Sequence, residues 1–435
     1  MHPHQTLSAI FHHAVSAVHP VQLMRNSVQV SGRTITVCGS SHTLDAGGRI
    51  WVIGAGKASA AMAQELEHLL GGHFPLQGFI VTKYGHALPL QHLAWLEAGH
   101  PVPDANSVAA SVKILEIAHT ATAADMVIFL LSGGASSLMA DFPVNSSLEE
   151  VQELFGLLLA SGADIHEMNT VRKHISMIKG GWLAKSIYPA PLYTIILSDV
   201  PGDDLSIIGS GPTVPDPSTF ADTMAVLQQY RLTEKIPLPI RNYLQEAQEG
   251  LFPETPKPGD PDFSRVVNCL AGTNRIALEA AAGKARELGY HPHIFSSQTT
   301  GNAPTVAEMV VQEAISWSGP LPACLLWGGE TTVQVSGDGT GGRNQHLALA
   351  AAIALAGQEN ITLLSAGTDG TDGPTDAAGA IVDGYTVINA EKLSLQANTF
   401  LQRHDSATFF SKAGGQMITG PTQTNVMDLI IVLKV

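Results

Sequence analysis

Two glycine-rich turns contain the residue types that bind phosphate groups in proteins. Residues 53–59 (IGAGKAS) follow an apolar run and place Lys57 beside two glycines, and residues 132–137 (SGGASS) follow the apolar run MVIFLL. Glycine lets backbone N–H groups approach an anion at the start of a helix, and serine hydroxyls add further donors. The residues expected to contact the anion are Gly54, Gly56, Ser132, Gly133, Gly134, Ala135, Ser136 and Ser137.

The first turn does not match the two best-known phosphate motifs. A Walker A loop needs glycine at the position of Trp51, and a dinucleotide fingerprint needs a third glycine at the position of Ser59. The next predicted strand ends at Lys83, where a dinucleotide site has an acidic residue for the ribose. A plain tight turn between strand and helix is the alternative interpretation.

A third glycine-rich turn leads into a predicted helix. Residues 336–345 (SGDGTGGRNQ) contain four glycines and end at Arg343 and the two residues after it. Arginine is always charged and can hold phosphate through two parallel hydrogen bonds. We therefore expect an anion nest here, with the Arg343 guanidinium at its mouth.

Carboxylates gather in two turns that follow predicted strands. Residues 198–213 contain Asp199, Asp203 and Asp204, and residues 365–376 (SAGTDGTDGPTD) contain Asp369, Asp372 and Asp376. Carboxylates beside phosphate-binding turns suit Mg²⁺, which prefers oxygen ligands and keeps several waters. The metal-ligand candidates are Asp199, Asp204, Asp369 and Asp372. Turn capping by aspartate is the alternative, above all for Asp376.

Residues 169–180 (NTVRKHISMIKG) hold the densest group of basic side chains, namely Arg172, Lys173, His174 and Lys179. A solvated helix face is the simpler interpretation of this run, and a structural role is expected for His174.

Together, the glycine turns, Lys57, Arg343 and the aspartates indicate phosphoryl transfer. That chemistry needs positive groups and Mg²⁺ to offset charge, and a carboxylate to orient the attacking hydroxyl. Neither a GxSxG nor an HExxH motif occurs.

The elements that must position these turns alternate between strand and helix. Apolar runs at residues 50–55, 78–82, 126–131 and 193–198 predict strands of a parallel sheet with helices on both faces. Residues 250–263, with four prolines, predict a linker or long surface connection, and a second alternation follows. We predict two α/β domains: residues 1–255 with a Rossmann-like, doubly wound, mainly parallel sheet, and residues 256–435. The run at residues 428–434 could close the second sheet.

Composition excludes several classes of function. The chain has 435 residues with a formal net charge of −15, which argues against a nucleic-acid or anionic-membrane partner. The cysteines Cys38, Cys269 and Cys324 are far apart and odd in number, so we expect neither a disulfide framework nor a cysteine zinc site. No signal peptide or bilayer-spanning apolar run is visible. We therefore expect a cytoplasmic protein.

The motifs together resemble those of the class II glycerate kinases (glycerate 2-kinases), in the family's order and over most of the chain. The matching stretches are GAGKAS, LSGGASS, NTVRKHISMIKGG, LSDVPGDDLSIIGSGPTVPDPSTF, GTNRIALEAA, GGETTVQV, GGRNQ and SAGTDGTDGPTDAAGA. The C-terminal half resembles the family's MOFRL domain. The resemblance implies ATP-dependent phosphorylation of D-glycerate to 2-phosphoglycerate with a divalent metal, here Mg²⁺. It also implies an active site in the cleft between the two domains.

The resemblance also implies roles for individual residues. The catalytic positions are Lys57, Asp199, Arg343 and Asp369. The turn at Gly133–Ser137 is expected at the nucleotide phosphates, and Arg172 and Asn274 at the substrate. Asp199 and Asp369 share the tasks of orienting the hydroxyl and holding Mg²⁺, with the division left open. His346 departs from the family's pattern, because GGRNQ is usually followed by glutamate.

Two alternatives stay open. One is an NAD(P)-dependent hydroxypyruvate reductase, which the missing third glycine and Lys83 disfavour. The other is a nucleotide-sensing module without catalysis. The expected partners are the small molecules D-glycerate and ATP, and a homodimer is left open.

Overall fold

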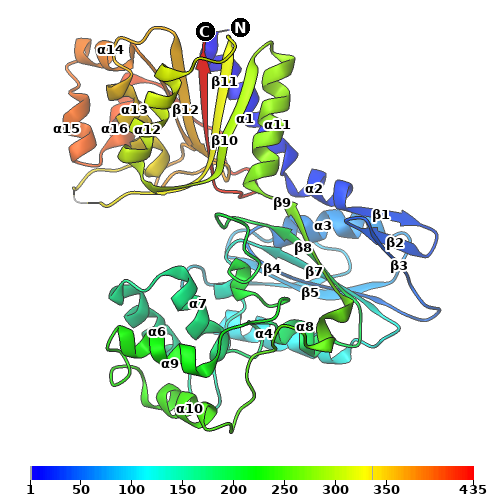
Figure 1. Cartoon of the computed structure of the whole chain (residues 1–435). Helices are drawn as coiled ribbons and strands as arrows, with labels where there is room; N and C mark the ends of the chain where they lie inside the picture. Colours follow the sequence, from blue (N-terminus) through cyan, green and yellow to red (C-terminus); the bar gives the residue numbers. More distant parts are fainter. Residues whose placement is uncertain (1, 336) are drawn as a thin grey trace. The chain divides into compact units, whose positions relative to one another are not determined.

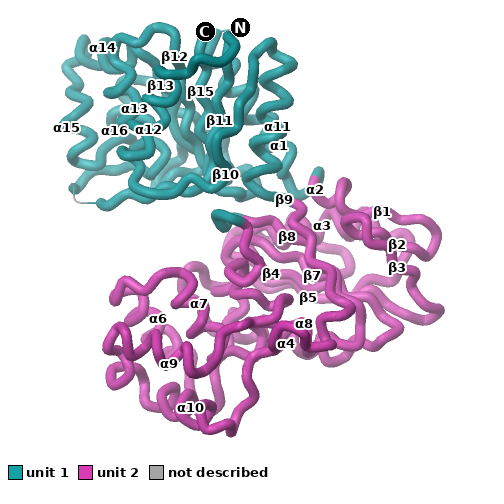
Figure 2. The backbone as a smooth tube through the Cα atoms, viewed as in Figure 1, with its two compact units in different colours: residues 1–22, 199–202, 272–435 teal, residues 23–198, 203–271 magenta. Residues whose placement is uncertain are grey.

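The computed structural model describes residues 2–335 and 337–435, so Ser336 of the predicted nest lies outside the described residues. The chain forms two compact units, which Figure 2 colours separately. Unit 1 comprises residues 1–22, 199–202 and 272–435, and unit 2 comprises residues 23–198 and 203–271. Each unit is therefore assembled from segments that are distant in the sequence.

A six-stranded sheet forms the centre of unit 2, in the order β6-β5-β4-β7-β8-β9 (Figure 1). Its strands are β4 (Ile50–Ala55), β5 (Leu76–Lys83), β6 (Ala94–Ala98), β7 (Met126–Ser132), β8 (Leu192–Leu197) and β9 (Val266–Gly272). Strands β4 to β8 pair in parallel. The strand order reverses between β4 and β7, and ligands of doubly wound sheets bind at the carboxyl ends of strands beside such a reversal.

The helices of unit 2 begin where the sequence offers caps. Asp104 caps α4, and Ser147 with Glu150 forms a capping box at the start of α6. The helices are α2 (Pro20–Ser27), α3 (Ser59–Leu70), α4 (Ala105–Thr120), α5 (Ala135–Leu138), α6 (Leu148–Ser161), α7 (Ile165–His174), α8 (Trp182–Ile187), α9 (Phe220–Gln229) and α10 (Leu238–Gln248), with 3₁₀ turns η1 (Ile208–Ser210) and η2 (Pro261–Arg265). Helices α6, α7, α9 and α10 share an apolar cluster that includes Leu154, Val171, Leu227 and Ile240.

Unit 1 contains a second six-stranded sheet, in the order β10-β11-β15-β12-β13-β14. Its strands are β10 (His291–Asn302), β11 (Ala323–Thr332), β12 (Ile361–Gly367), β13 (Gly379–Asp383), β14 (Gln416–Met417) and β15 (Asp428–Lys434). Only β10 and β11 are parallel among these pairs. Strand β15 lies between β11 and β12, so it is a central strand and does not close an edge. All seven of its residues are buried, which explains its unbroken apolar run.

The helices of unit 1 cover this sheet, with α1 and α11 drawn close together and α12 to α16 on the other side in Figure 1. They are α1 (Pro3–Ala17), α11 (Asn274–Glu287), α12 (Ala303–Ser316), α13 (Arg343–Ala354), α14 (Thr386–Lys392), α15 (Ala397–Gln402) and α16 (Ser406–Ala413). Helix α13 is buried along most of its length, and its small alanines pack against α12 and the sheet. That burial fixes Arg343 at its first turn.

A small antiparallel sheet of unit 2 was not predicted from the sequence. Its strands β1 (Val28–Ser31), β2 (Thr34–Val37) and β3 (Ser40–Thr43) are short and largely polar. Cys38, between β2 and β3, forms a disulfide bond with Cys269 of β9, with their Cα atoms 6.2 Å apart. The expectation that the cysteines form no disulfide is therefore wrong. The spacing of cysteines in the sequence does not show which of them folding brings together, and these two are 231 residues apart.

The predicted α/β class, with a mainly parallel N-terminal sheet and a second α/β sheet, is confirmed. The compact units divide the chain differently from the predicted boundary at residue 255. The proline-rich segment packs into unit 2, where Thr255 is buried and donates to Asp216, and the first helix belongs to unit 1. Within residues 2–335 and 337–435, no helix combines the length and apolar character needed to cross a bilayer.

Candidate functional site

The two predicted phosphate turns of unit 2 contact each other at the point where the strand order reverses. The backbone N–H of Lys57 donates to the carbonyl of Gly133 at 2.9 Å, and that of Ala58 donates to Ser132 Oγ at 3.1 Å. Gly56 has a φ of 133°, and a Cβ atom there would collide with Ser132. Glycine is therefore required for this close approach of β4 and β7.

Lys57 presents a free cation at this junction. Within residues 2–335 and 337–435, no side chain or carbonyl forms an ion pair or hydrogen bond with its ammonium group. Lys83, His86 and His100 lie near it: burial, followed by Lys57, Lys83 and His86, lowers the pKa of His100 to about 4. Burial also lowers the pKa of His86, so Lys57 and Lys83 are the cations at this junction, and their charge is suited to binding an anion. Sequence reasoning found Lys57 but missed His86 and His100, which come from separate loops.

The serine hydroxyls of the second turn bind other parts of the protein. Ser132 Oγ accepts from Ala58, Ser136 Oγ lies 2.9 Å from Ser210 Oγ, and Ser137 Oγ donates to the carbonyl of Pro101 at 2.9 Å. Gly134, with a φ of 87°, precedes Ala135, the first residue of the one-turn helix α5. These hydroxyls hold the turn in place, and its backbone is what remains for a ligand.

The basic segment at α7 is largely buried, contrary to the expectation of a solvated helix face. Lys173 is 6% exposed and forms an ion pair with Asp216 at 3.3 Å, and Lys179 is 5% exposed and donates to the carbonyl of Met139 at 2.6 Å. His174 is buried between Asp216, Glu254 and the Phe220 ring, which supports the expected structural role. Lys173 and Lys179 can be buried because folding supplies each with a carboxylate or carbonyl partner.

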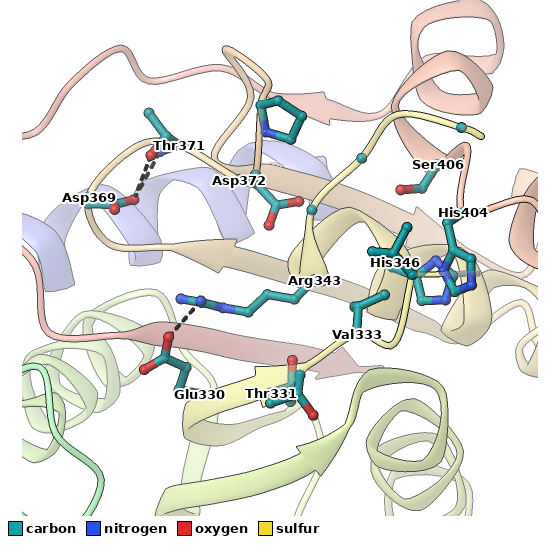
Figure 3. Close-up of a pocket in the computed structure, with 17 residues that line it drawn as sticks. Glu330, Thr331, Val333, Arg343, His346, Asp369, Thr371, Asp372, His404 and Ser406 are labelled. Carbon is teal, nitrogen blue, oxygen red and sulfur yellow. Dashed lines mark hydrogen bonds and ion pairs between the residues drawn. The ribbon is translucent and has the colours of Figure 1, made fainter. Parts of the chain in front are cut away.

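Arg343 and Asp369 line one pocket of unit 1, with a volume of about 570 Å³ (Figure 3). The Arg343 guanidinium pairs with both oxygens of Asp428, at 2.6 and 3.0 Å, and with Glu330 at 2.6 Å. Burial lowers the pKa of Arg343, but Asp428 and Glu330 outweigh it and raise the pKa. Sequence reasoning missed both carboxylates, although Glu330 stands in the quoted GGETTVQV stretch. The negative charges of Asp428 and Glu330 offset the positive charge of Arg343 at the predicted anion nest.

Asp372 occupies the start of α13, where the nest was predicted. Its carboxylate accepts hydrogen bonds from the backbone N–H groups of Asn344 and Gln345, at 2.9 and 2.8 Å. Burial raises the pKa of Asp372, and these donors oppose the shift. The helix N-terminus is therefore already bound by an internal anion, because the turn after β12 lies against α13. This contact supports a capping role for Asp372.

Asp369 has one oxygen in a local turn and one that no described residue contacts. Its Oδ1 accepts from the backbone N–H and hydroxyl of Thr371, at 3.0 and 3.2 Å, as Figure 3 shows. Mg²⁺ is commonly held by one or two carboxylates together with waters and substrate phosphates. Asp369 fits such a ligand, whereas both oxygens of Asp372 are engaged. Among the described residues, no group of three or more acidic, histidine or cysteine side chains is arranged to hold a metal ion by itself.

The remaining predicted residues are spread over both units. Asp199 belongs to unit 1 and accepts from Asn425 Nδ2 at 3.3 Å, and Asp204 belongs to unit 2, where it is exposed and caps a turn through Ser206. Asn274 is 1% exposed, and its amide donates to the carbonyls of Val426 and Asp428. Asn274 thus braces the turn that carries Asn425 and Asp428, and a direct contact with substrate stays a prediction.

His346 lies in the first turn of α13 and stacks on His404, with ring centroids 4.6 Å apart (Figure 3). Burial, followed by His404, lowers the pKa of His346 to about 4. The imidazole is therefore neutral at neutral pH. Both rings line the same pocket as Arg343.

Comparison with known proteins assigns the two halves to families. The model of a domain of unknown function, DUF4147, matches residues 6–245, and that of the MOFRL family matches residues 323–428. Neither match includes residue 255, so the predicted boundary there stays a prediction.

Relatives match over nearly the whole chain. A protein of Thermotoga maritima named D-glycerate 2-kinase is 42% identical over 89% of this chain and 91% of its own length. A protein of Agrobacterium vitis, which carries hydroxypyruvate reductase as a provisional name, is 39% identical over 99% of this chain and 94% of its own. The crystal structure of glycerate kinase from Thermotoga maritima superposes with a TM-score of 0.88 at 38% identity, covering 99% of both chains. The chain therefore belongs to the class II glycerate kinase family, in which a DUF4147 domain precedes a MOFRL region.

Proposed function

We propose that this protein transfers the terminal phosphoryl group of ATP to the 2-hydroxyl group of D-glycerate, giving 2-phosphoglycerate and ADP. The observation that carries the proposal is the unpartnered ammonium of Lys57, held beside Gly133 where the strand order reverses. The family relationship and the name of the Thermotoga maritima relative support the same activity.

In this proposal, Lys57 contacts the transferring phosphoryl group and offsets its charge. Arg343 is oriented by Asp428 and Glu330 and lines the pocket, where its guanidinium would contact a phosphate or a carboxylate. Asp369 or Asp199 orients the 2-hydroxyl and accepts its proton. Asp369 fits an Mg²⁺ ligand better than Asp372, whose two oxygens both accept hydrogen bonds, and the metal would neutralise charge on the phosphates when bound. The interdomain location of the site stays a prediction from the resemblance.

The direct test is ADP release from ATP with D-glycerate and Mg²⁺, followed by identification of the product. Enolase dehydrates 2-phosphoglycerate without a mutase, so enolase alone should produce the ultraviolet absorbance of phosphoenolpyruvate. Product that requires a mutase first would contradict the 2-hydroxyl as acceptor.

Two further outcomes would favour the alternatives. Oxidation of NADH with hydroxypyruvate would favour a reductase, which is the activity named for the Agrobacterium vitis relative. Tight binding of ATP with no turnover of D-glycerate would favour a nucleotide sensor. Either result would overturn the kinase proposal.

A further inference from the structure

A second pocket, with a volume of about 330 Å³, lies entirely within unit 2, and the mechanism above does not use it. It begins at Ser136 and Ser137 of the turn after β7, and its other walls come from α6, α7 and residues 101–103. Most of the wall is apolar and includes Val151, Leu159, Met168 and Ile175. This size and character are typical of a site for a small organic molecule.

The pocket contains a flat cationic platform. The Arg172 guanidinium lies over the Phe155 ring, 4.9 Å from its centroid, and both side chains line the pocket. Guanidinium planes and aromatic rings are the groups on which proteins stack nucleobases. The platform therefore favours a planar ring system over glycerate, so this proposal gives Arg172 a different ligand from the substrate expected for it from the sequence.

Gln152 supplies a directed polar group on the same wall. Its Nε2 donates to the carbonyl of Pro103 at 2.7 Å, which fixes the orientation of the amide. No described residue donates to its Oε1, so this carbonyl oxygen is left to accept a hydrogen bond. The exocyclic amino group of adenine is a donor of the required kind.

The turn at residues 132–137 connects this pocket to Lys57. Gly133 accepts from the Lys57 backbone, and Ser136 and Ser137, a few residues later, line the pocket. We propose that the pocket binds the adenine base of ATP, and that the phosphates run along this turn toward Lys57. The proposal rests on the kinase function proposed above, because it assigns the nucleotide half of that site.

Gly156 allows the pocket to be blocked without disturbing the backbone. It lies on α6 and lines the pocket, and a Cβ atom added there meets no atom within 4 Å. Gly156→Leu should fold, because leucine favours helix more than glycine does. The matched control is Gly283→Leu, on α11 of unit 1, where an added Cβ also meets nothing within 4 Å.

The experiment measures ADP binding by calorimetry and, in parallel, steady-state kinetics. Gly156→Leu should raise the Kd for ADP and the KM for ATP at least tenfold, with kcat and the KM for D-glycerate within twofold of wild type. Inhibition by pyrophosphate should not change, because that probe has no base. Gly283→Leu should match wild type in every measurement. Folded Gly156→Leu protein that binds ADP with unchanged affinity would overturn the pocket assignment.

Two further arms complete the test. If Gly156→Leu does not fold, Leu159→Glu repels the nucleotide from a wall position that is 71% exposed, and the same tenfold loss is expected. IDP, whose base lacks the exocyclic amino group, should bind wild type more weakly than ADP; equal affinity would refute the role given to Gln152. One outcome separates the two proposals. If wild type binds ADP but does not turn over D-glycerate, and Gly156→Leu weakens that binding, the pocket assignment is supported and the proposed function is refuted.

Discussion

At the scale of single residues, an unpartnered charge separates a candidate catalytic group from a structural one. Lys173 and Lys179 carry the same kind of side chain as Lys57, but each is buried against its own carboxylate or carbonyl. Lys57 has no such partner in the described chain and lies near Lys83, so an anion bound there would offset the charge of both ammonium groups.

Replacement of Lys57 by methionine keeps the length of the side chain and removes its charge. We expect kcat to fall about 10²–10³-fold, the loss typical of removing one charge-stabilising group from a transition state. The coupled ADP-release assay measures this change. Lys113→Met is the control, because Lys113 is exposed and pairs with Glu116 of the same helix. Equal rates for the two variants would remove Lys57 from the mechanism.

His346 gives a prediction about pH. Its pKa of about 4 lies below the ordinary histidine value of 6.5, so the unfolded state takes up a proton first as the pH falls. The stability that His346 contributes is complete above pH 6.5 and is lost progressively between pH 6.5 and about 4. His346→Phe keeps an aromatic ring for stacking on His404 and does not titrate.

Denaturant titrations at pH 7, 6 and 5 test whether the contribution of His346 to the unfolding free energy decreases as the pH falls. The unfolding free energy of His346→Phe should fall less with decreasing pH than that of wild type, by up to about 1.4 kcal/mol per pH unit in this window. Parallel curves for both proteins would show that His346 is not held neutral by its surroundings.

At the scale of elements, glycine turns take different roles according to what packs beside them. The turn before α3 joins the turn after β7 and leaves a lysine free, whereas the turn before α13 receives the carboxylate of Asp372. Both are glycine-rich turns before a helix, so their sequences alone predict the same anion site. The neighbouring segment decides whether a helix start already has an internal carboxylate, as the start of α13 has in Asp372.

Asp372→Ala tests the internal cap of α13. We expect a loss of about 0.5–2 kcal/mol in unfolding free energy, the range for removing a helix cap, because two buried N–H groups lose their acceptor. Chemical denaturation followed by circular dichroism measures it. Asp376→Ala is the control, since it lies in the same turn but accepts no hydrogen bond from α13 in the described structure. An equal, negligible effect of both substitutions would contradict the cap.

At the scale of the whole molecule, each unit draws on distant segments of the chain. Unit 2 holds the β1–β3 sheet to strand β9 through the Cys38–Cys269 disulfide, across a separation of 231 residues. A cross-link over so long a loop restricts the unfolded chain strongly, which favours the folded state.

Removal of the disulfide should therefore destabilise unit 2. We expect the double variant Cys38→Ser with Cys269→Ser to lose about 2–4 kcal/mol of unfolding free energy. Dithiothreitol should produce a similar loss in wild type and no further loss in the double variant. Titration of thiols in the denatured, unreduced protein gives the contradicting outcome: three free thiols per chain would exclude the bond.

The sequence by itself determined the α/β class, the parallel sheet with its strands near residues 50–55, 78–82, 126–131 and 193–198, and the glycine turns that follow strands of that sheet. These follow from apolar periodicity, capping residues and glycine, whose physical effects act over a few neighbouring residues. Only the tertiary structure decided which groups meet. Arg343 pairs with Asp428 and Glu330, Asp372 caps α13, Lys173 pairs with Asp216, and Cys38 forms a disulfide with Cys269. Such partners are separated by up to hundreds of residues, and a charge or thiol has no local pattern that names the group it will meet once the core has packed.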